Sequence, residues 1–483
     1  MHICVVGDGV AGLMAANLFA SRNYATKVTH ISSSKIPTIG VGESTTLNFE
    51  TLHREFDTDF DSFIQESDAC IKLGVLYKNW ANKDFLHHFR SHKLFHKSIE
   101  YFNILGNKDE NTYIHDLVAN KLFKDATESN LMPFFDKNYL YNYSWHFDAG
   151  KYIAYLKKLL KKRTNVTVID DIVVKCNFSE KDTISSLILE SNTNISANYY
   201  VICTGNNPNN SKIFNIEYTD LGNVLLTDKA LFFPKKYTDK QEEIHPYTVA
   251  KTMKYGWRWI TPTWSRVGTG YVFSSKHISI ENAIKEFVED IGDNSIEPNV
   301  VDFNPKYNSK TFKNNYMTLG MCNGFLEPLD APGISISTIF TLLIDLIFKN
   351  NEINSNYQEK YNAFVHELYL GWTAFILTQY KTCYRNDTDF WIDHKNVKFE
   401  YYDNIMQDFY NDRSTLTIYN VNDPDVIIKF LSFDFKMMMQ YTTAAKNVKW
   451  KTRSKIIPSK ISDPDYETQS HYEFIRKYHN PNA

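Results

Sequence analysis

Apolar and polar positions at the start of the chain predict a strand, a tight turn and a helix, in that order. The apolar run Ile3–Val6 is typical of a short buried strand, and Leu13–Phe19 follows a helical pattern. Between them lies a G-x-G-x-x-G motif formed by Gly7, Gly9 and Gly12. The first glycine allows the tight turn, the second lets the backbone approach a pyrophosphate, and the third lets the helix pack on the strand. We therefore expect a dinucleotide at the helix N-terminus.

The second predicted strand, Lys27–Ile31, leads to Ser32. A dinucleotide-binding unit usually carries an acidic residue about 20 positions after the glycine loop, where it binds the ribose. Because Ser32 stands there instead, we expect a weaker ribose contact or one made from elsewhere. A nicotinamide cofactor is correspondingly less favoured.

Further strands of the same kind recur much later in the chain. The apolar runs Val166–Ile169 and Ile172–Val174 predict two strands of the nucleotide-binding sheet, and Tyr199–Gly205 predicts a third. Strands so far apart in sequence imply a discontinuous nucleotide-binding domain, with an insertion near residues 76–140.

Helical patterns fill much of the remainder. Tyr143–Ala149 is interpreted as the start of a helix that continues through Leu160, with Ser144 or Asp148 as its N-cap. From about residue 350 the pattern is mostly helical, and the last thirty or so residues are polar. A helix with one apolar face precedes this region, at Ile339, Leu342, Leu343 and Leu346.

Two tryptophans lie on a later predicted strand. Trp257 and Trp259 are two positions apart, so on an extended strand both indoles point to the same face. Gly256 and Pro262 bracket them. Without context, core packing is the more common explanation of such a pair. The alternative is a rigid apolar wall beside a functional site.

Lys72 is the only charged residue between Asp68 and Lys78, within an apolar alternating run. A lysine carried into apolar surroundings loses solvation, which lowers its pKa and makes the amine a better donor or nucleophile. By spacing alone, a lysine that points to solvent is the favoured alternative.

Two other short segments are compatible with ligand contacts. The stretch Phe85–Phe89 combines aromatic and imidazole side chains that would line a pocket, although a histidine between phenylalanines is more often structural. Gly40 and Gly42, followed by Glu43 and Ser44, would let the backbone pass close to a flat ligand. An ordinary glycine-containing loop is the alternative for that segment.

Composition narrows the class of protein without naming a function. The 483 residues exceed the size at which one core keeps growing, so two subdomains are expected. Hydrophobic content of 43% and charged content of 23% are typical of a soluble globular protein. A net charge of −3 gives no global field for nucleic acid. Aromatic residues reach 15%, for which a compositional bias is the safer explanation than an aromatic pocket.

The six cysteines are scattered, with no C-x-x-C pair and no histidine-rich cluster. This pattern favours a reducing, cytoplasmic location and argues against a metal site or a disulfide framework. The first residues lead straight into a strand, so we expect no signal peptide. We also expect no membrane-spanning segment, because we find no apolar run of about 18 residues.

Together, these segments resemble the flavin-dependent halogenases of the tryptophan-halogenase type, from residue 1 to about residue 345. The W-x-W-x-x-P signature of that family is met by Trp257, Trp259 and Pro262, and its G-V-G-E segment begins at Gly40. The stretch Trp145–Ala149 also matches a family segment. The asparagine-, lysine- and tyrosine-rich composition is similar to that of a viral, marine cyanophage member, which would place it in the host cytoplasm.

The resemblance implies an α/β fold: a Rossmann-like FAD-binding domain of the flavin-monooxygenase type, with a mostly helical substrate subdomain. We assign residues 1–75, 141–210 and 250–345 to the FAD-binding domain. Residues 76–140, 211–249 and 346–483 would form the subdomain that binds substrate.

The resemblance also implies roles for individual residues. The catalytic lysine of the family falls on Lys72, and its acidic partner falls on Asp330. The halide would lie at Pro332 and Gly333. The substrate pocket would be lined by Phe85, His87 and Phe89, and the expected FAD contacts are Gly7, Gly9, Gly12, Ser32, Gly40, Gly42, Glu43, Ser44, Val173 and Ile334.

Two departures from the family pattern affect specificity. The family segment V-E-P-L-E-S-T-G is replaced by Leu326–Gly333, so an aspartate stands in place of glutamate and Ala331-Pro332 in place of Ser-Thr. Proline lacks a backbone N–H, so we expect weaker binding of chloride than of bromide or iodide. The family's Tyr-Tyr segment is also missing, and the methionine-rich stretch Ser432–Tyr441 lies roughly there. We therefore expect a phenol, indole or heteroarene other than free tryptophan as substrate.

The activity implied by the resemblance is halogenation of an aromatic ring by hypohalous acid, formed from reduced FAD, oxygen and halide. The acid would pass the wall of Trp257 and Trp259, and Lys72 would hydrogen-bond it or form a haloamine. Asp330 would stabilise the cationic ring or take its proton. A single dinucleotide loop implies that a separate reductase supplies FADH2. The alternatives are an aromatic hydroxylase and a flavin-binding protein without turnover. The oligomeric state is left open, with a homo-oligomer as one option.

Overall fold

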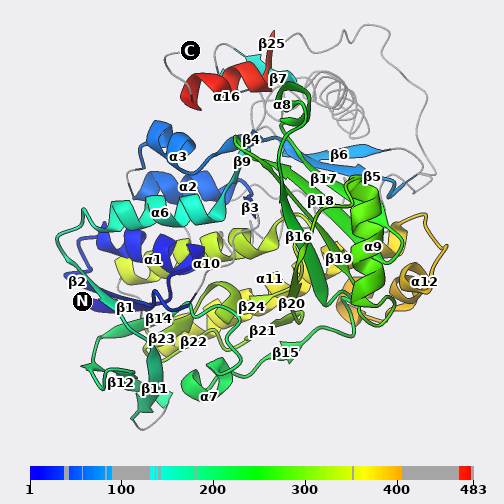
Figure 1. Ribbon diagram of the computed structural model, residues 1–483. Coiled ribbons are helices and arrows are strands. Elements are labelled where there is room, and N and C mark those ends of the chain that lie inside the picture. Colours follow the sequence, from blue (N-terminus) through cyan, green and yellow to red (C-terminus); the bar gives the residue numbers. More distant parts are fainter. Residues whose placement is uncertain are drawn as a thin grey trace, which may run out of the picture.

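The computed structural model describes residues 1–36, 43–56, 58–81, 84–89, 131–135, 138–139, 143–179, 182–350, 353–404 and 467–479. Two large sheets organise this part of the chain, and helices lie against both of them (Figure 1).

The first large sheet has six strands in the order β10-β2-β1-β14-β23-β22. All neighbouring pairs are parallel except β22 with β23. Its strands come from positions throughout the first 320 residues, which confirms that the sheet is assembled from distant segments. They are β1 (His2–Val6), β2 (Lys27–Ser32), β10 (Val166–Asp170), β14 (Tyr199–Ile202), β22 (Phe312–Lys313) and β23 (Tyr316–Thr318).

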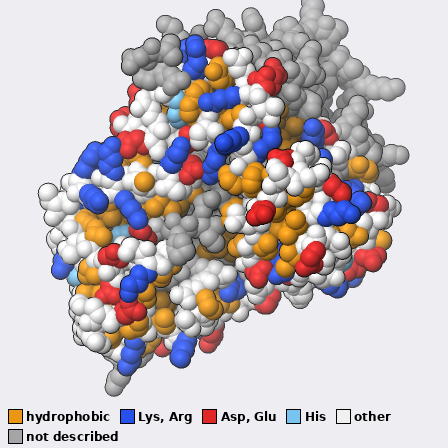
Figure 2. Space-filling view, in the orientation of Figure 1, with side chains coloured by type: hydrophobic (Ala, Val, Ile, Leu, Met, Phe, Trp, Pro, Cys, Tyr) orange, Lys and Arg blue, Asp and Glu red, His pale blue; other side chains and the backbone are white. Residues whose placement is uncertain are grey.

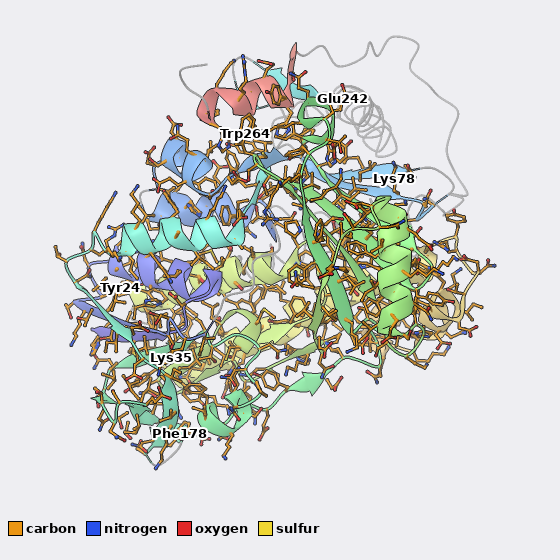
Figure 3. The ribbon with its side chains drawn as sticks, viewed as in Figure 1. Tyr24, Lys35, Lys78, Phe178, Glu242 and Trp264 are labelled. Atoms are coloured by element: carbon orange, nitrogen blue, oxygen red, sulfur yellow. The ribbon has the colours of Figure 1, made fainter. Side chains whose placement is uncertain are left out.

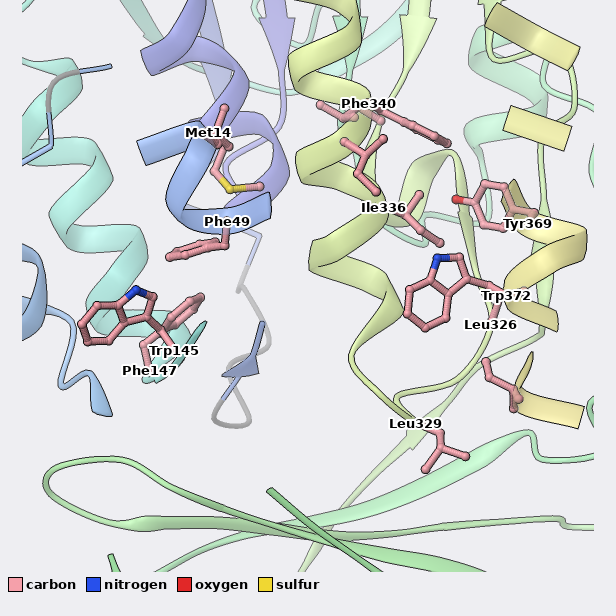
Figure 4. Packing of buried hydrophobic residues seen from close by; sticks show 14 of the residues in the cluster. Met14, Phe49, Trp145, Phe147, Leu326, Leu329, Ile336, Phe340, Tyr369 and Trp372 are labelled. Carbon is pink, nitrogen blue, oxygen red and sulfur yellow. The ribbon is translucent and has the colours of Figure 1, made fainter. Parts of the chain in front are cut away.

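Five helices pack against this sheet or against one another, and their apolar side chains extend the core of the sheet. The central pair is α1 and α10, which contact each other, and α1 also contacts α6. By length and composition α10 is apolar enough to cross a membrane, but 67% of that window is buried inside the protein, as expected of a core helix. In Figure 4, Ile336 and Phe340 of α10 lie on the side of Tyr369 and Trp372, and Phe49 lies with Trp145 and Phe147 in the other part of the view. The helices are α1 (Val10–Ala20), α2 (Asn48–Glu55), α3 (Phe60–Glu66), α6 (Ala149–Leu160) and α10 (Pro332–Lys349).

The second large sheet has seven strands in the order β20-β16-β19-β18-β17-β5-β6. One face packs against α9 (Ile280–Ile291), where Phe287 is buried with Tyr271 and Phe273. The other face belongs to the main core and includes Trp257 and Trp259. The strands are β5 (Gly74–Lys78), β6 (Phe85–His88), β16 (Lys229–Lys235), β17 (Thr248–Met253), β18 (Gly256–Pro262), β19 (Val267–Phe273) and β20 (Asn299–Asp302).

Four three-stranded sheets complete the β structure of the described residues. They have the orders β3-β9-β4, β11-β12-β13, β15-β21-β24 and β25-β7-β8. Their strands are β3 (Glu43–Ser44), β4 (Cys70–Lys72), β7 (Leu131–Phe135), β8 (Asn138–Tyr139), β9 (Ser144–Phe147), β11 (Val173–Phe178), β12 (Ile184–Leu189), β13 (Asn194–Ile195), β15 (Thr219–Asp220), β21 (Lys306–Tyr307), β24 (Gly324–Phe325) and β25 (Glu467–Ser470).

Two element predictions were wrong. The stretch Ser144–Phe147 is strand β9 rather than the start of a helix, and α6 begins only at Ala149. The Asp148 side chain accepts a hydrogen bond from the Lys151 backbone N–H, so Asp148 is the N-cap. The run at Val173 is in β11, which pairs with β12 in a small sheet of its own and not with β10.

The remaining described helices are α7 (Asn210–Phe214), α8 (Lys240–Glu243), the 3-10 helix η2 (Gly320–Cys322), α11 (Ser355–Thr382), α12 (Asp389–Asn396) and α16 (His471–His479). The helical interpretation of the region after residue 350 is confirmed by α11 and α12. Near the C-terminus α16 stacks His479 on Trp264, with the ring centroids 4.7 Å apart, so this segment packs on the core (Figure 3). The predicted stretch Ser432–Tyr441 lies outside the described residues. The assignment of residues to two subdomains stays a prediction.

All six cysteines are buried and unpaired. Acidic and basic side chains are interspersed on the face seen in Figure 2, with no large patch of one sign.

Candidate active site

The glycine loop joins β1 to α1, and each of its three glycines occupies a distinct environment. Gly7 has a φ of +123°, and a Cβ there would collide with the carbonyl oxygen of Cys203. A Cβ at Gly12 would collide with the carbonyl oxygen of Gly7. By contrast, no atom lies within 4 Å of a Cβ built on Gly9. The outer glycines therefore fit the turn and the helix–strand packing, while the middle one leaves open space for a ligand.

The N-terminus of α1 has the features of an anion site. Its N-cap, Gly9, supplies no side-chain hydrogen bond, and the first turn contains no acidic residue. The first N–H groups of the helix are thus free of a side-chain cap. The loop is held from behind by His30, whose Nε2 lies 3.0 Å from the Gly7 carbonyl oxygen. Burial lowers the pKa of His30, so this support is a neutral imidazole at neutral pH.

The other predicted cofactor residues that the structure describes lie in four different elements: β2, β3, β11 and α10. Ser32 ends β2 opposite Asp170, and Ser44 Oγ lies 3.1 Å from Thr248 Oγ1. Glu43 pairs through its backbone with Phe147 in β9. Val173 is buried in β11 and Ile334 lies in the first turn of α10, whereas Gly40 and Gly42 lie outside the described residues.

The strand register explains how the tryptophan pair is presented. Tyr77, Ala250, Trp259 and Gly270 lie opposite one another across β5, β17, β18 and β19. Residues directly opposite in a sheet share a face, so Tyr77 lies on the tryptophan side. The centroids of Trp257 and Trp259 are 6.3 Å apart, and both indoles are buried. The prediction that the two indoles share a face is confirmed.

A methyl group at Gly270 is expected to disturb this pair. The indole of Trp259 and the carbonyl oxygen of Leu231 occupy the place of a Cβ at Gly270. Gly270→Ala should therefore lower the free energy of unfolding by about 1–3 kcal/mol, as measured by urea denaturation followed by tryptophan fluorescence. Gly150→Ala, in the first turn of α6, is the matched control and should leave the free energy of unfolding unchanged or raise it by up to about 1 kcal/mol. Equal stability of the two variants would contradict the close packing of Trp259.

Lys72 is the last residue of β4, where the chain passes from a three-stranded sheet into β5 of the large sheet. The side chain is 1% exposed, so the structure favours the buried interpretation over the solvent-pointing one. Its Nζ donates to the carbonyl oxygen of Thr45 at 3.0 Å and lies 5.3 Å from the centroid of the Phe89 ring. Burial lowers the pKa of the Lys72 amine to about 8, against the opposing effect of the Asp330 charge.

Asp330 lies in the loop before α10 and is 8% exposed. Tyr77 donates its phenolic hydrogen to Oδ2, and His87 Nδ1 lies 3.4 Å from Oδ1. Burial alone would raise the pKa of Asp330, but the charge and hydrogen bond of His87, the Tyr77 hydroxyl and Lys72 together hold it below its usual value. The Asp330 carboxylate is therefore ionised, and it interacts electrostatically with the Lys72 amine, which is also buried.

The residues predicted to hold a halide form the start of α10. Asp330 and Ala331 both have a φ of +61°, which is uncommon for residues with a side chain. The Ala331 N–H is already used by the Pro328 carbonyl oxygen at 2.9 Å, and Pro332 has none. Gly333 and Ile334 follow as the next backbone donors of the first turn, with no side-chain cap on the helix.

Comparison with known proteins identifies the family. The family model described as tryptophan halogenase matches residues 2–422. The chain belongs to the tryptophan halogenase family. The predicted resemblance is therefore confirmed, and the family consists of flavin-dependent enzymes that receive reduced flavin from a separate reductase.

Individual relatives cover most of the chain. The tryptophan 7-halogenase RebH of Lentzea aerocolonigenes is 26% identical over 422 residues, which cover 82% of this chain and 79% of that protein. The tryptophan 6-halogenase ThaL of Streptomyces albogriseolus is 24% identical over 431 residues, with 82% and 79% covered.

Solved structures show the same fold. The tryptophan halogenase of Shewanella frigidimarina matches with a TM-score of 0.76 at 22% identity, over 99% of this chain and 97% of that chain. The flavin-dependent halogenase Xcc4156 of Xanthomonas campestris matches with a TM-score of 0.75 at 20% identity, over 99% and 98%. The predicted Rossmann-like FAD-binding fold is confirmed. The open space at Gly9 and the uncapped N-terminus of α1 fit the pyrophosphate of FAD.

The predicted pocket residues of this tryptophan halogenase family member lie in β6 and directly after it. His87 contacts Asp330, and its ring centroid lies 5.7 Å from that of Phe375 in α11. Phe89 lies beside the Lys72 amine. The backbone of Phe85 pairs with Tyr77. His87 and Phe89 are therefore brought to the two charged groups of the site.

Three further site residues of this halogenase family member were missed from the sequence: Tyr77, Glu327 and Tyr380. Tyr77 binds Asp330, and Tyr380 donates to Glu327 at 3.0 Å. Glu327 is fully buried and also accepts a hydrogen bond from the Trp257 indole at 3.2 Å. The period-two pattern that places Trp257 also places Tyr77 on a strand face, but no sequence signal pairs it with a loop some 250 residues later.

Proposed function

We propose that the chain is an FADH2-dependent halogenase that makes hypohalous acid from oxygen and a halide and transfers the halogen to an electron-rich aromatic ring. The observation that carries this proposal is the buried Lys72 amine whose charge interacts with that of the ionised Asp330, which Tyr77 joins to the sheet face that carries the paired indoles.

Within this proposal, the cofactor is held by the glycine loop and the start of α1. Gly7 and Gly12 set the shape of the loop, Gly9 admits the pyrophosphate, and the helix N-terminus attracts its charge. Ser44, Val173 and Ile334 are proposed as further contacts. Bound reduced FAD would give two electrons to oxygen, and the halide would give two more as it becomes hypohalous acid.

Trp257 and Trp259 are proposed to separate the flavin from the aromatic substrate. Both are buried. Trp259 fills the space above Gly270, and the indole N–H of Trp257 is held by Glu327, so each ring is fixed by its surroundings. Such a wall passes a small oxidant and excludes an arene, which suppresses direct hydroxylation. Pro262 is the last residue of β18, the strand that carries both tryptophans.

Lys72 is proposed to direct the halogen, either by hydrogen bonding to hypohalous acid or as a haloamine. In the haloamine route the amine nitrogen forms a bond to the halogen, hydroxide leaves as water with the amine proton, and the halogen then passes to the ring. The pKa of about 8 makes both protonation states of Lys72 accessible near neutral pH. Asp330 is placed to stabilise the cationic ring or accept its proton.

The proposed substrate is a phenol, indole or heteroarene rather than free tryptophan. His87, Phe89 and Phe375 give the side next to Lys72 and Asp330 an aromatic character that suits a flat ring. The proposal is tested by supplying a flavin reductase, FAD, oxygen and bromide with a panel of such arenes. We expect a brominated product, recognised by its isotope pattern in mass spectrometry. No brominated product from any electron-rich arene would contradict the proposal.

Halide preference gives a separate prediction. Because the Ala331 N–H is occupied and Pro332 has none, this loop offers a halide fewer backbone N–H donors than the Ser-Thr segment of the family would. The loss of a donor should weaken the binding of the strongly hydrated chloride more than that of the larger bromide. With equal bromide and chloride in one reaction, we expect brominated product to exceed chlorinated product by about threefold to tenfold, the value of roughly one hydrogen bond.

Pro332→Ala is the matched variant because it restores the backbone N–H while keeping a small apolar side chain. The bromide-to-chloride product ratio should fall in this variant, with little change in the total amount of product. A wild-type ratio that favours chloride would end the idea, as would a ratio unchanged by the substitution.

A further inference from the structure

Glu327 is a buried carboxyl group on the same face of the seven-stranded sheet as the tryptophan pair. It lies between β24 and α10 and is 0% exposed. Three donors converge on it: Trp257 Nε1 at 3.2 Å from Oε1, Thr227 Oγ1 at 2.6 Å from Oε2, and the Tyr380 hydroxyl at 3.0 Å from both oxygens.

The donors come from three separate parts of the fold. Trp257 is on β18, Tyr380 is on α11 and Thr227 precedes β16. An indole N–H is a donor only and cannot reverse its role, whereas both hydroxyl groups can also accept. The carboxylate is therefore the acceptor that fixes the orientation of the Trp257 ring.

Glu327 is also joined to the other end of the site by a short piece of chain. Three residues later Asp330 accepts the hydrogen bond of Tyr77, on the same sheet face. Trp80 bridges the two phenols, with its ring centroid 5.5 Å from that of Tyr77 and 5.6 Å from that of Tyr380. The segment Glu327–Asp330 thus carries one carboxyl group at the indole wall and one that interacts electrostatically with Lys72.

We propose that Glu327 is a positioning residue: it holds the indole of Trp257 and, through the segment to Asp330, keeps the wall and the acidic group in fixed relation. The inference rests on the halogenase function proposed above. It assigns Glu327 no contact with substrate or flavin.

The electrostatics make this role measurable. Burial raises the pKa of Glu327 to about 7, although the three donated hydrogen bonds oppose that rise. Among the described residues, the titratable groups around it are Tyr77 and Tyr380, whose pKa values burial raises well above their ordinary value. His394 stacks on Tyr380, and burial lowers its pKa to about 3. Of these four groups, Glu327 is therefore the one whose pKa lies near neutral pH.

The test follows the indole N–H of Trp257 by ¹⁵N–¹H spectroscopy of the full chain labelled in its tryptophan side chains, with Trp257→Phe used to assign the resonance. We expect the Trp257 resonance to move with pH with a midpoint near 7, and to lose that dependence in Glu327→Gln. In Thr227→Val, which removes one donor but leaves the indole contact, the midpoint should move upward. A Trp257 resonance that is indifferent to pH and to both substitutions would overturn the inference.

The functional readout is coupling, the amount of halogenated product formed per reduced flavin consumed. In Glu327→Gln we expect coupling to fall by about tenfold, with the KM for the arene nearly unchanged, because the wall and Asp330 lose their fixed relation. Unchanged coupling would overturn the inference. The spectroscopic measurement needs no turnover, so it is informative even in an inactive enzyme. Absence of halogenated product from the wild type would instead contradict the proposed function.

Discussion

Replacing Lys72 with methionine is expected to lower halogenation by at least about a thousandfold while reduced flavin is still oxidised at its wild-type rate. Methionine keeps the length of the side chain and removes the amine that donates to Thr45. Burying an amine costs solvation free energy, so the substitution should not reduce the free energy of unfolding. The measurement is halogenated product by mass spectrometry, beside flavin oxidation by absorbance.

Lys78→Met is the matched control, because Lys78 lies exposed at the end of β5 (Figure 3). It should leave product formation unchanged. A Lys72→Met enzyme that still halogenates would remove Lys72 from the chemistry.

The pH dependence adds a second readout at Lys72. With a pKa of about 8, the neutral amine becomes more abundant as pH rises from 7 to 9. A rate that rises through this range favours the haloamine route, and a rate that falls favours hydrogen bonding by the ammonium form. In either case the inflection near pH 8 should be absent from any residual activity of the Lys72→Met enzyme.

Replacing Asp330 with asparagine is expected to lower kcat for halogenation by about a hundredfold, with a smaller effect on the KM for the arene. Asparagine keeps the shape and can still accept from Tyr77, but it carries no charge to stabilise a cationic ring or take its proton. The measurement is steady-state kinetics with excess bromide and reductase.

Asp330→Glu is the matched control because it retains the carboxylate. It should keep activity within about tenfold of the wild type, since only the reach of the group changes. If Asp330→Asn were as active as Asp330→Glu, the charge at this position would have no part in the reaction.

Residue patterns within a single segment were enough to predict the tryptophan pair and the glycine loop, because each of these features is formed by one continuous stretch of chain. Spacing by two placed Trp257 and Trp259 on one face, and the glycine loop was predicted from the elements on either side of it. The stretch Ser144–Phe147 was misread because all four residues are buried, so a strand covered on both sides showed no clear alternation. Asp148 was nonetheless identified as a possible cap.

Contacts between distant segments could not be predicted in this way. By spacing alone Lys72 was expected to point to solvent, because the groups that bury it, Thr45 and Phe89, come from other elements. Val173 lies in β11, which pairs with β12 and not with a strand of the six-stranded sheet. A local apolar run predicts a strand but does not indicate which other strand it pairs with. The bonds of Tyr77 to Asp330 and of Trp257 to Glu327 follow from the register of the large sheet.

The measurement that tests the central claim most directly is the product formed from one electron-rich arene with reductase, FAD and oxygen, with and without bromide. If Trp257 and Trp259 keep the arene from the flavin while Lys72 receives the oxidised halogen, the arene is brominated when bromide is present and is unchanged when it is absent. A hydroxylated arene, formed at the same rate with and without bromide, would show that the ring reaches the flavin and would contradict that claim.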